Sequence, residues 1–521
     1  MVRRFFIIVA LFAFLGATMS TVSLAASKSA FSRFMPLKGA MLGPRGKTIP
    51  LTGFVAGVLA NHVAQPPAPR SKSAGPIGIA PRPFSAVTHI FGLFSANEPS
   101  LAVDPVISNH MFASANDYRL GFDSAPGLYR TFKGTTGWLD GLVQYVNSGP
   151  YYYNAAGDPA VGSDIPGDEF VAMLAFNRYA ISGGNPQNSV LVARTHFSIG
   201  DNFVDAVPAN IETDVLGFLN DKDSFTTDNG STGSFVSGDY VAWTRFSSSD
   251  SPIMASSSHT FGCHGCWSAP VLVSHPGGVG LCPFSFGGNP GSCSDNTASS
   301  VAIGSLGTVW IAYENFDTPH IPNQILIAKS TDGGATFGAP VRVADNLHDI
   351  FNPVGFFRVN SFPNLAVNRV TGKLYVVWAD MRNGSAQILG SQSATGAAGT
   401  WSAPVVLNSD SGTNFHFFPA VSVNPGSGNV YVSFYSNENN VGKNKYDYVF
   451  RKLSATLGGT MTDEPLNSST IDPSFGAFGG FFFGDYTASS PDQAAGIGAC
   501  VAWTDDNAVV GEENIQNTCV K

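Results

Sequence analysis

The sequence predicts an all-β protein, a β-propeller built from four-stranded antiparallel blades. Three observations support this fold class: an apolar strand recurs along the chain, a polar turn of fixed spacing recurs after it, and the composition suits buried strands joined by turns. The chain has 521 residues, with 57 Gly, 40 Phe and only 12% charged residues, which is typical of many turns and few surface helices. We predict seven blades, with six as the alternative.

The recurring strand ends in an aromatic residue followed by a polar one, and the number of its copies gives the number of repeat units. Its copies read DYVAWTR at 239–245, VWIAYEN at 309–315, LYVVWAD at 374–380, VYVSFYS at 430–436 and CVAWTDD at 500–506, with weaker copies MFASAND at 111–117 and MLAFNR at 173–178. A further strand precedes these, with good copies at 99–105, 363–369 and 419–425. The steps between units are 56 to 70 residues long. Units of this size with four strands each are typical of propeller blades that carry loop insertions.

The polar turn is clearest in KSTDGGATFGAPV at 329–341. We predict a hairpin turn held by side chains, because Ser and Asp accept hydrogen bonds from nearby backbone N–H groups and Gly supplies positive φ. Decayed copies occur at 393–401 and 454–460. The residues expected to have this structural role are Ser330, Asp332, Gly334, Thr336 and Phe337.

This turn resembles the Asp-box, or BNR repeat, of sialidases and related β-propellers. The resemblance covers residues 98–521 at the level of architecture and implies a sialidase-like propeller with a central pocket. Sialidases have six blades and an Arg-Ile-Pro motif ahead of the first Asp-box. This sequence has seven units, and in that motif's place it offers only APRPF at 80–84 and FFRVNSFP at 356–363.

The chain divides into three parts. Residues 1–26 read as a secretory signal peptide, with Arg3 and Arg4, an apolar core and small residues before the expected cleavage site. Residues 27–84 form a basic, Pro/Ala-rich leader that we predict to be disordered. Residues 85–521 form the sialidase-like propeller. All 37 acidic residues lie from Glu98 onward, where only 18 of the 28 basic residues remain, so a basic leader precedes an acidic ring.

The last unit supplies only three strands of its own. The apolar segment SAVTHIFGLF at 85–94 lies just before the first blade, and we predict that it adds the fourth strand. This would close the ring and leave no sheet edge open.

The six cysteines fit an exported protein, and we expect a secreted or periplasmic chain. Disulfides are favoured over zinc, because the second pair lacks the short spacing of a zinc ribbon. A bridge between the last two would tie down the C-terminal strand. The cysteines are Cys263, Cys266, Cys282, Cys293, Cys500 and Cys519.

The residues that could do chemistry are expected on the ring face opposite the polar turns. A sialidase holds the sugar carboxylate with several arginines, because a planar guanidinium matches a carboxylate bidentately. It also needs a carboxylic acid and a tyrosine nucleophile. The resemblance therefore implies three catalytic candidates, Asp221, Asp485 and Tyr486, and four substrate-binding candidates, Arg119, Arg245, Arg358 and Arg382.

Two functions from different classes remain open. The first is an exported, non-catalytic module that binds a glycan or an extracellular protein, and the seventh unit and the missing Arg-Ile-Pro motif favour it. The alternative is an exo-sialidase-type glycoside hydrolase with a central arginine-clamp pocket. We expect a monomer with no cofactor, no metal and no membrane span, and the acidic propeller argues against nucleic acid as a partner.

Overall fold

The computed structural model describes most of the predicted propeller. The described residues are 36–37, 40–42, 48–50, 88–90, 95–119, 125–132, 134, 137–143, 153, 155–165, 167–177, 187–196, 209–214, 218–230, 238–247, 249–259, 266–284, 289–318, 323–350, 357–410, 412, 414–458, 463–475, 482–494, 498–506 and 513–520. The predicted signal peptide lies outside them. Most of the predicted disordered leader does so too, so disorder there stays a prediction.

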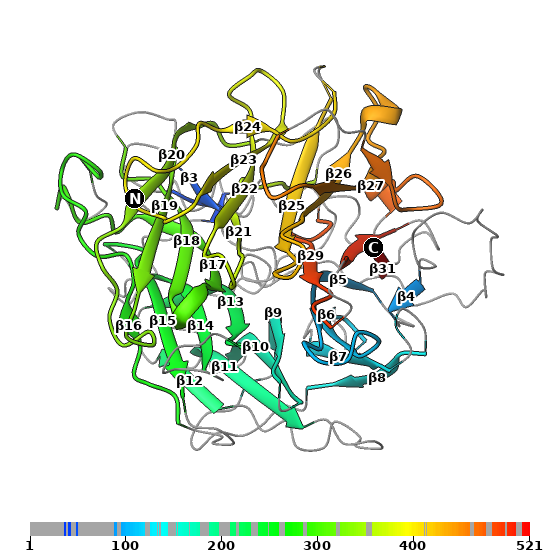
Figure 1. Ribbon diagram of the computed structural model, residues 1–521, viewed down its shortest axis with the longest axis horizontal. Coiled ribbons are helices and arrows are strands. Elements are labelled where there is room, and N and C mark those ends of the chain that lie inside the picture. Colours follow the sequence, from blue (N-terminus) through cyan, green and yellow to red (C-terminus); the bar gives the residue numbers. More distant parts are fainter. Residues whose placement is uncertain are drawn as a thin grey trace, which may run out of the picture.

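Seven four-stranded antiparallel sheets form a propeller ring in the described part of the chain (Figure 1). Blade 1 has β5 (Ala96–Val103), β6 (Met111–Asp117), β7 (Ala125–Thr131) and β8 (Leu139–Leu142). Blade 2 has β9 (Ala155–Ser163), β10 (Asp168–Asn177), β11 (Gln187–His196) and β12 (Ala209–Asp214). Blade 3 has β13 (Leu219–Thr227), β14 (Asp239–Phe246), β15 (Ile253–Ser258) and β16 (Val271–Leu272).

The remaining blades follow the same order from the inner to the outer strand. Blade 4 has β17 (Asn296–Ile303), β18 (Val309–Asn315), β19 (Asn323–Ser330) and β20 (Val341–Leu347). Blade 5 has β21 (Asn364–Val367), β22 (Leu374–Asp380), β23 (Gln387–Ser393) and β24 (Val405–Val406). Blade 6 has β25 (His416–Val423), β26 (Val430–Ser436), β27 (Asp447–Leu453) and β28 (Glu464–Pro465). Blade 7 has β29 (Ala488–Pro491), β30 (Ala499–Asp505), β31 (Asn514–Val520) and β4 (Thr88–Ile90). The prediction of an all-β, seven-bladed propeller is confirmed.

The ring closes as the sequence predicts. Strand β4, from the segment 85–94, pairs antiparallel with the C-terminal β31, with Ile90 opposite Ile515 and His89 opposite Gln516. Figure 1 shows β4 beside β31 at the C-terminal end of the chain. The two ends of the propeller are therefore joined within one blade, and this pairing covers the edge that β31 would otherwise expose.

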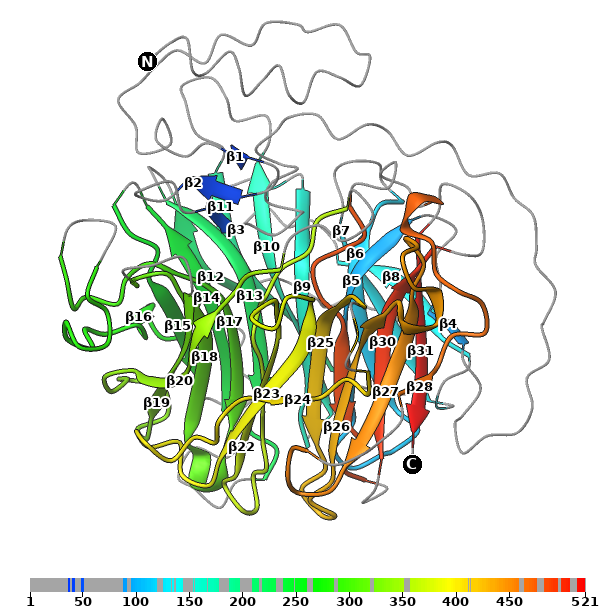
Figure 2. The same ribbon diagram turned by 90° about the horizontal axis from the view of Figure 1, so that it is seen from above.

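Regular structure outside the blades is short. In the leader, β1 (Pro36–Leu37), β2 (Ala40–Leu42) and β3 (Thr48–Pro50) form a separate three-stranded sheet, which Figure 2 shows beyond one end of the ring. The single-turn 3₁₀ helices are η3 (Ser305–Gly307), η4 (Glu438–Asn440) and η5 (Pro473–Phe475). Within the described residues, no helix has the length and apolar character needed to cross a membrane.

The core lies between neighbouring blades. The recurring second strands are apolar and β-branched or aromatic, which suits a strand buried on both faces. Every residue of β18, β22, β26 and β30 is buried. Their aromatic residues fill the space between sheets: Trp503 of blade 7 stacks on Tyr448 of blade 6 with ring centroids 4.8 Å apart. A single blade could not cover these faces alone, so the ring stabilises each blade through its neighbours.

The structure describes two complete disulfides, Cys282–Cys293 and Cys500–Cys519. The first lies in the connection between β16 and β17, and the second joins directly opposed residues of β30 and β31. Cys266 is also disulfide-bonded, and Cys263 lies outside the described residues. Disulfides persist in oxidising compartments, which is consistent with an extracellular or periplasmic location.

Candidate functional site

The inner strands of the seven blades surround the ring axis. Each of β5, β9, β13, β17, β21, β25 and β29 contacts the inner strand of the next blade, and β29 contacts β5. We call the face at which these strands begin the upper face and the opposite one the lower face; Figure 2 shows the strands running between the two. The second strand of each blade ends at the upper face, because it runs antiparallel to the first. Side chains at the start of different inner strands can therefore meet at the axis.

A β-bulge with an unusual backbone recurs near the start of the inner strands. The register shifts in blades 1, 2, 3, 4 and 6. In each, one residue that is not glycine has positive φ: Glu98 at 57°, Asp158 at 52°, Lys222 at 46°, Ala298 at 58° and Phe418 at 50°. This conformation costs about 1–3 kcal/mol per residue and is concentrated at functional sites in proteins. The recurrence of the strain therefore directs attention to the upper end of the axis.

Chemically active side chains occupy these positions on one half of the ring. Each bulge residue lies two positions before the residue at which regular pairing resumes, and the same position in blades 5 and 7 is Phe362 and Tyr486. Going round from blade 7, the seven residues are Tyr486, Glu98, Asp158, Lys222, Ala298, Phe362 and Phe418. Blades 7, 1, 2 and 3 thus supply a phenol, two carboxyl groups and an ammonium, whereas blades 4, 5 and 6 supply apolar groups.

A buried pair of carboxyl groups links blades 1 and 2. Glu98 and Asp158 are both fully buried. The side chain of Asn116 connects them, since its Nδ2 donates to Glu98 Oε2 at 2.6 Å and its Oδ1 accepts the Asp158 backbone N–H at 2.7 Å. Burial, followed by the negative charges of Asp158 and Asp485, raises the pKa of Glu98 well above its usual value. Glu98 therefore keeps its proton at a pH at which an exposed glutamate has lost it.

Two residues from opposite sides of the ring meet across the axis. Lys222 Nζ, from blade 3, lies 4.0 Å from the centroid of the Tyr486 ring, from blade 7. The Tyr486 hydroxyl is buried without a hydrogen-bond partner among the described residues. Burial, and then the charges of Asp158, Glu98, Asp223 and Asp485, raise the pKa of Tyr486 well above its usual value. This ammonium–aromatic contact shows that the cluster is centred on the axis.

The next residue of blade 3 adds a further acid. Asp223 is 1% exposed, and neither of its carboxyl oxygens has a hydrogen-bond partner among the described residues. Burial raises the pKa of Asp223 well above its usual value, while the adjacent Lys222 lowers it. Several titratable groups with displaced pKa values therefore face one another at one point, which is a physical sign of a functional site.

Blade 5 contributes a guanidinium to the same cluster. Arg358 Nε lies 2.7 Å from Asp485 Oδ1, and its Nη2 lies 2.8 Å from Oδ2, in a bidentate pair. Asn360 Nδ2 donates to the Asp485 carbonyl oxygen at 2.9 Å. These contacts join the segments that lead into β21 and β29, which are two blades apart. We use the name axial cluster for Glu98, Asp158, Lys222, Asp223, Arg358, Asp485 and Tyr486.

Of the predicted catalytic and substrate-binding residues, the structure brings Asp485, Tyr486 and Arg358 into this cluster. Asp221 lies at its border: it is fully buried, and its Oδ1 accepts the Lys222 backbone N–H at 2.9 Å. Its position next to Lys222 does not by itself assign it a role, and the catalytic assignment stays a proposal.

The other three predicted arginines have contacts at the ends of second strands. Arg119 pairs with Asp117 and Asp140. Arg382 pairs with Asp380 and donates to the Asp345 carbonyl oxygen at 3.1 Å. Arg245 lies over the Phe218 ring, 5.4 Å from its centroid. These contacts do not gather the four arginines around one point, and their role as a clamp stays a proposal.

The sequence places Glu98, Asp158 and Asp223 among the residues expected at the starts of first strands, on the ring face opposite the polar turns, but it assigns none of them a role, and it does not mark Lys222. A usable signal was present for two of them: EPSLAV at 98–103 and DPAV at 158–161 share their proline position with FPNLAV at 362–367 and FPAVSV at 418–423. Aligning these segments places an acid or an aromatic residue immediately before the proline in blades 1, 2, 5 and 6. No such signal marks Lys222, because its unit has Asp223 in place of the proline.

The lower face carries the polar turn of blade 4. Ser330 Oγ accepts the Gly334 N–H at 2.9 Å and donates to Asp332 Oδ1 at 2.7 Å, while Asp332 Oδ1 accepts the Thr336 N–H at 2.9 Å. The decayed copy in blade 5 keeps one of these bonds, because Ser393 Oγ accepts the Gly396 N–H at 2.8 Å. The side chains therefore bond within their own turns, far along the strands from the axial cluster.

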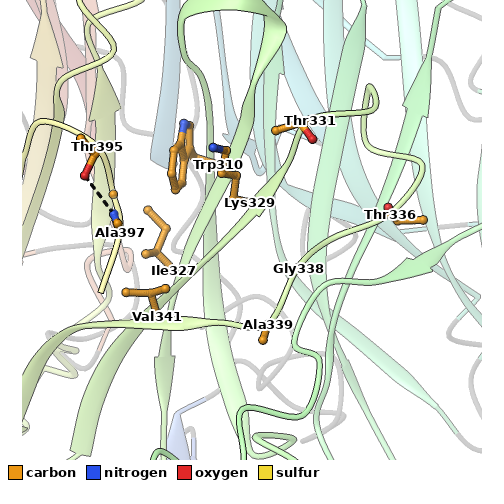
Figure 3. A pocket seen from close by; sticks show the side chains of 11 residues that line it. Trp310, Ile327, Lys329, Thr331, Thr336, Gly338, Ala339, Val341, Thr395 and Ala397 are labelled. Atoms are coloured by element: carbon orange, nitrogen blue, oxygen red, sulfur yellow. Dashed lines mark hydrogen bonds between the residues drawn. The ribbon is translucent and has the colours of Figure 1, made fainter. Parts of the chain in front are cut away.

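A groove of about 400 Å³ lies between these two turns. Figure 3 shows Thr395 and Ala397 on one side of it, Thr331 and Thr336 on the other, and Trp310 and Lys329 between them. Lys329 Nζ lies 5.2 Å from the centroid of the Trp310 ring. The described residues that line the groove include no carboxyl group, in contrast to those of the axial cluster.

Comparison with known proteins returned structural similarity alone. No protein-family model matches the chain, and the comparison with curated proteins found no match. Among solved structures, a sialidase of Trypanosoma rangeli has a TM-score of 0.37 at 11% identity, over 68% of this chain and 53% of that chain, so this chain spans about half of its length. An ulvan lyase has a TM-score of 0.45 at 10% identity, over 81% of this chain and 94% of that chain. An α-L-arabinofuranosidase of Fusarium graminearum has a TM-score of 0.42 at 9% identity, over 84% of this chain and 98% of that chain. The activities in these names belong to those proteins.

Proposed function

We propose that the chain is a glycan-processing β-propeller that cleaves a glycosidic bond at the axial cluster. The observation that carries the proposal is the buried Glu98–Asp158 pair beside Tyr486. Glycoside hydrolysis needs a carboxylic acid that keeps its proton at working pH and a second group that stabilises or attacks the sugar cation. Glu98 has the raised pKa of the first group. Tyr486, whose hydroxyl lies near the carboxyl groups of Asp158, Glu98 and Asp485, is the candidate for the second group.

The cations of the cluster narrow the substrate class. Arg358 is already paired bidentately with Asp485, and Lys222 lies over Tyr486 and donates to the Asp223 carbonyl oxygen at 3.3 Å. A sugar carboxylate would need several uncommitted guanidinium groups, which the contacts of the predicted arginines do not supply. We therefore propose neutral glycosides as substrates, and sialosides serve as the comparison.

A second candidate is glycan binding without catalysis, and one observation favours it. The carboxyl groups of Glu98, Asp158 and Asp223 are 0–1% exposed, whereas Tyr486 and Lys222 are partly exposed. A ligand that approaches from the upper face would meet the aromatic ring and the ammonium before any acid. An aromatic surface bordered by polar groups is a common ligand-binding arrangement.

Hydrolysis of fluorogenic glycosides separates the two candidates. The purified chain is assayed with neutral aryl glycosides and a sialoside, beside Tyr486→Phe and the matched control Tyr240→Phe. Tyr240 also has a buried hydroxyl without a hydrogen-bond partner among the described residues, but it lies opposite Thr226, near the lower end of β14. We expect turnover of a neutral glycoside that falls at least about 100-fold in Tyr486→Phe and is unchanged in Tyr240→Phe.

The outcomes that contradict the proposal are distinct. If no glycoside is cleaved but a glycan array shows binding that Tyr486→Phe abolishes, the non-catalytic candidate holds. If there is neither turnover nor binding, the axial cluster has no glycan function. Turnover confined to the sialoside would refute the neutral-substrate assignment and restore the arginine-clamp prediction.

A further inference from the structure

Three residues with metal-binding side chains meet at the junction of blades 5 and 6. His416 begins β25, Asp410 lies in the connection from β24, and Glu438 begins η4 after β26. One ligand atom from each of the three lies within 4.8 Å of the other two. None of them belongs to the axial cluster, so this site is argued independently of the proposed function.

The orientation of the His416 ring is the second observation. His416 is 1% exposed. Its Nδ1 lies 2.9 Å from the Ala386 carbonyl oxygen, which can only accept, so Nδ1 carries the proton and Nε2 presents a lone pair in the neutral ring. Nε2 lies 3.1 Å from Asp410 Oδ1, yet it makes no hydrogen bond of acceptable geometry. A backbone carbonyl on one ring nitrogen, with carboxylates facing the other, is the usual setting of a metal-binding histidine.

The carboxylates are held in place by neighbouring side chains. Asn408 Nδ2 donates to Asp410 Oδ1 at 2.9 Å, and Asn414 Nδ2 donates to Oδ2 at 2.6 Å. Ser409 Oγ donates to Glu438 at 3.2 Å. Asn414 Oδ1 is a further buried acceptor with no hydrogen-bond partner among the described residues. Ligating carboxylates are typically oriented in this way by outer hydrogen bonds.

The charge around the three residues favours a cation. Asp463 adds a third carboxylate next to Ser409, whose backbone N–H it accepts at 3.0 Å. Arg451 pairs with Asp463 and offsets one of these charges. The three carboxylates, less the one charge that Arg451 offsets, leave two negative charges close together in a partly buried place, which a divalent cation would neutralise.

We propose that Asp410, His416 and Glu438 bind one divalent transition-metal ion, with Zn²⁺ as the expected ion. One imidazole nitrogen with two carboxylates suits zinc, whereas Ca²⁺ takes six to eight oxygen ligands. Three protein ligands leave a coordination position for water or a ligand oxygen, and Glu438 is partly exposed. The ion would also connect the loop before β25 with η4. The sequence predicted no metal, because these ligands do not form a recognised spacing.

The test is metal binding by the full mature chain. The protein is treated with EDTA, dialysed against Zn²⁺ and analysed for bound metal, and Co²⁺ is added separately to read the ligand geometry from its visible absorption. The variants are His416→Gln and Glu438→Gln. The matched control is His348→Gln, because the His348 ring lies in an exposed setting with Asn346 Oδ1 3.3 Å from Nε2.

We expect about one Zn²⁺ per chain in the wild type and in His348→Gln, with affinity reduced more than about tenfold in both site variants. Circular dichroism of the metal-free proteins checks the folding of each variant, and Glu438→Gln provides the test if His416→Gln fails to fold. Equal zinc binding by all four proteins, or no zinc binding by the wild type, would overturn the proposal. Displacement of Zn²⁺ by equimolar Ca²⁺ would refute the assignment of the ion.

Discussion

Replacing Ser330 by Ala tests whether the polar turn of blade 4 is a structural element. The Ser330 hydroxyl is 1% exposed; it accepts the N–H of the buried Gly334 at 2.9 Å and donates to Asp332 at 2.7 Å. Without it, a buried N–H loses its acceptor, at about 1–3 kcal/mol, and one hydrogen bond to a carboxylate is lost. We expect the free energy of unfolding to fall by about 2–3 kcal/mol.

The assay is equilibrium unfolding in guanidinium chloride, read as a shift of the midpoint at unchanged slope. Thr336→Val is the matched control, because the Thr336 hydroxyl also bonds to Asp332 but is exposed, and its loss should cost less than about 1 kcal/mol. If the free energy of unfolding of Ser330→Ala lies within about 0.5 kcal/mol of the wild-type value, close to the scatter of surface substitutions, water or another group accepts the Gly334 N–H. The structural assignment of the turn would then be wrong.

Three further predictions concern stability. Burial, and then the charge of Asp505, raises the pKa of Asp506 to about 8. The folded state therefore holds a proton that the unfolded chain loses near pH 4. The free energy of unfolding should fall as the pH rises from about 4 to about 8. Asp506→Asn should flatten this loss of stability, by at most about 6 kcal/mol at about 1.4 kcal/mol per pKa unit, and a pH profile of the variant parallel to that of the wild type would contradict the assignment. The double variant Cys500→Ser, Cys519→Ser removes a disulfide between residues 19 positions apart in sequence. Its free energy of unfolding, measured in urea, should fall by about 3 kcal/mol. An unchanged midpoint would show that the pairing of β30 with β31 holds this edge without the disulfide. Deleting residues 85–94 removes β4 and leaves β31 with an open edge. The melting temperature of this deletion variant should fall sharply, whereas deletion of residues 27–80 should change the melting temperature little. Equal effects of the two deletions would refute ring closure by β4 as the main stabilising role of residues 85–94.

The site shows where prediction from sequence stops. Asp485 and Tyr486 could be selected because they lie just before one inner strand, and Arg358 because it lies in the segment that leads into another. Lys222 could not, since the repeat does not mark it and its partner Tyr486 lies 264 positions further along the chain. The same limit applies to His416, whose ring orientation depends on the Ala386 carbonyl of the neighbouring blade.

By itself, the sequence determined the seven units, the place of their second strands and the closing strand from 85–94. Each of these follows from local patterns, because a recurring apolar strand and turn carry the same physical constraint in every copy. Only the tertiary structure decided which side chains meet. Asn116 connects Glu98 and Asp158 across two blades, and closure of the ring brings Lys222 over Tyr486. Both depend on contacts between residues that are distant in the chain, which no local pattern encodes.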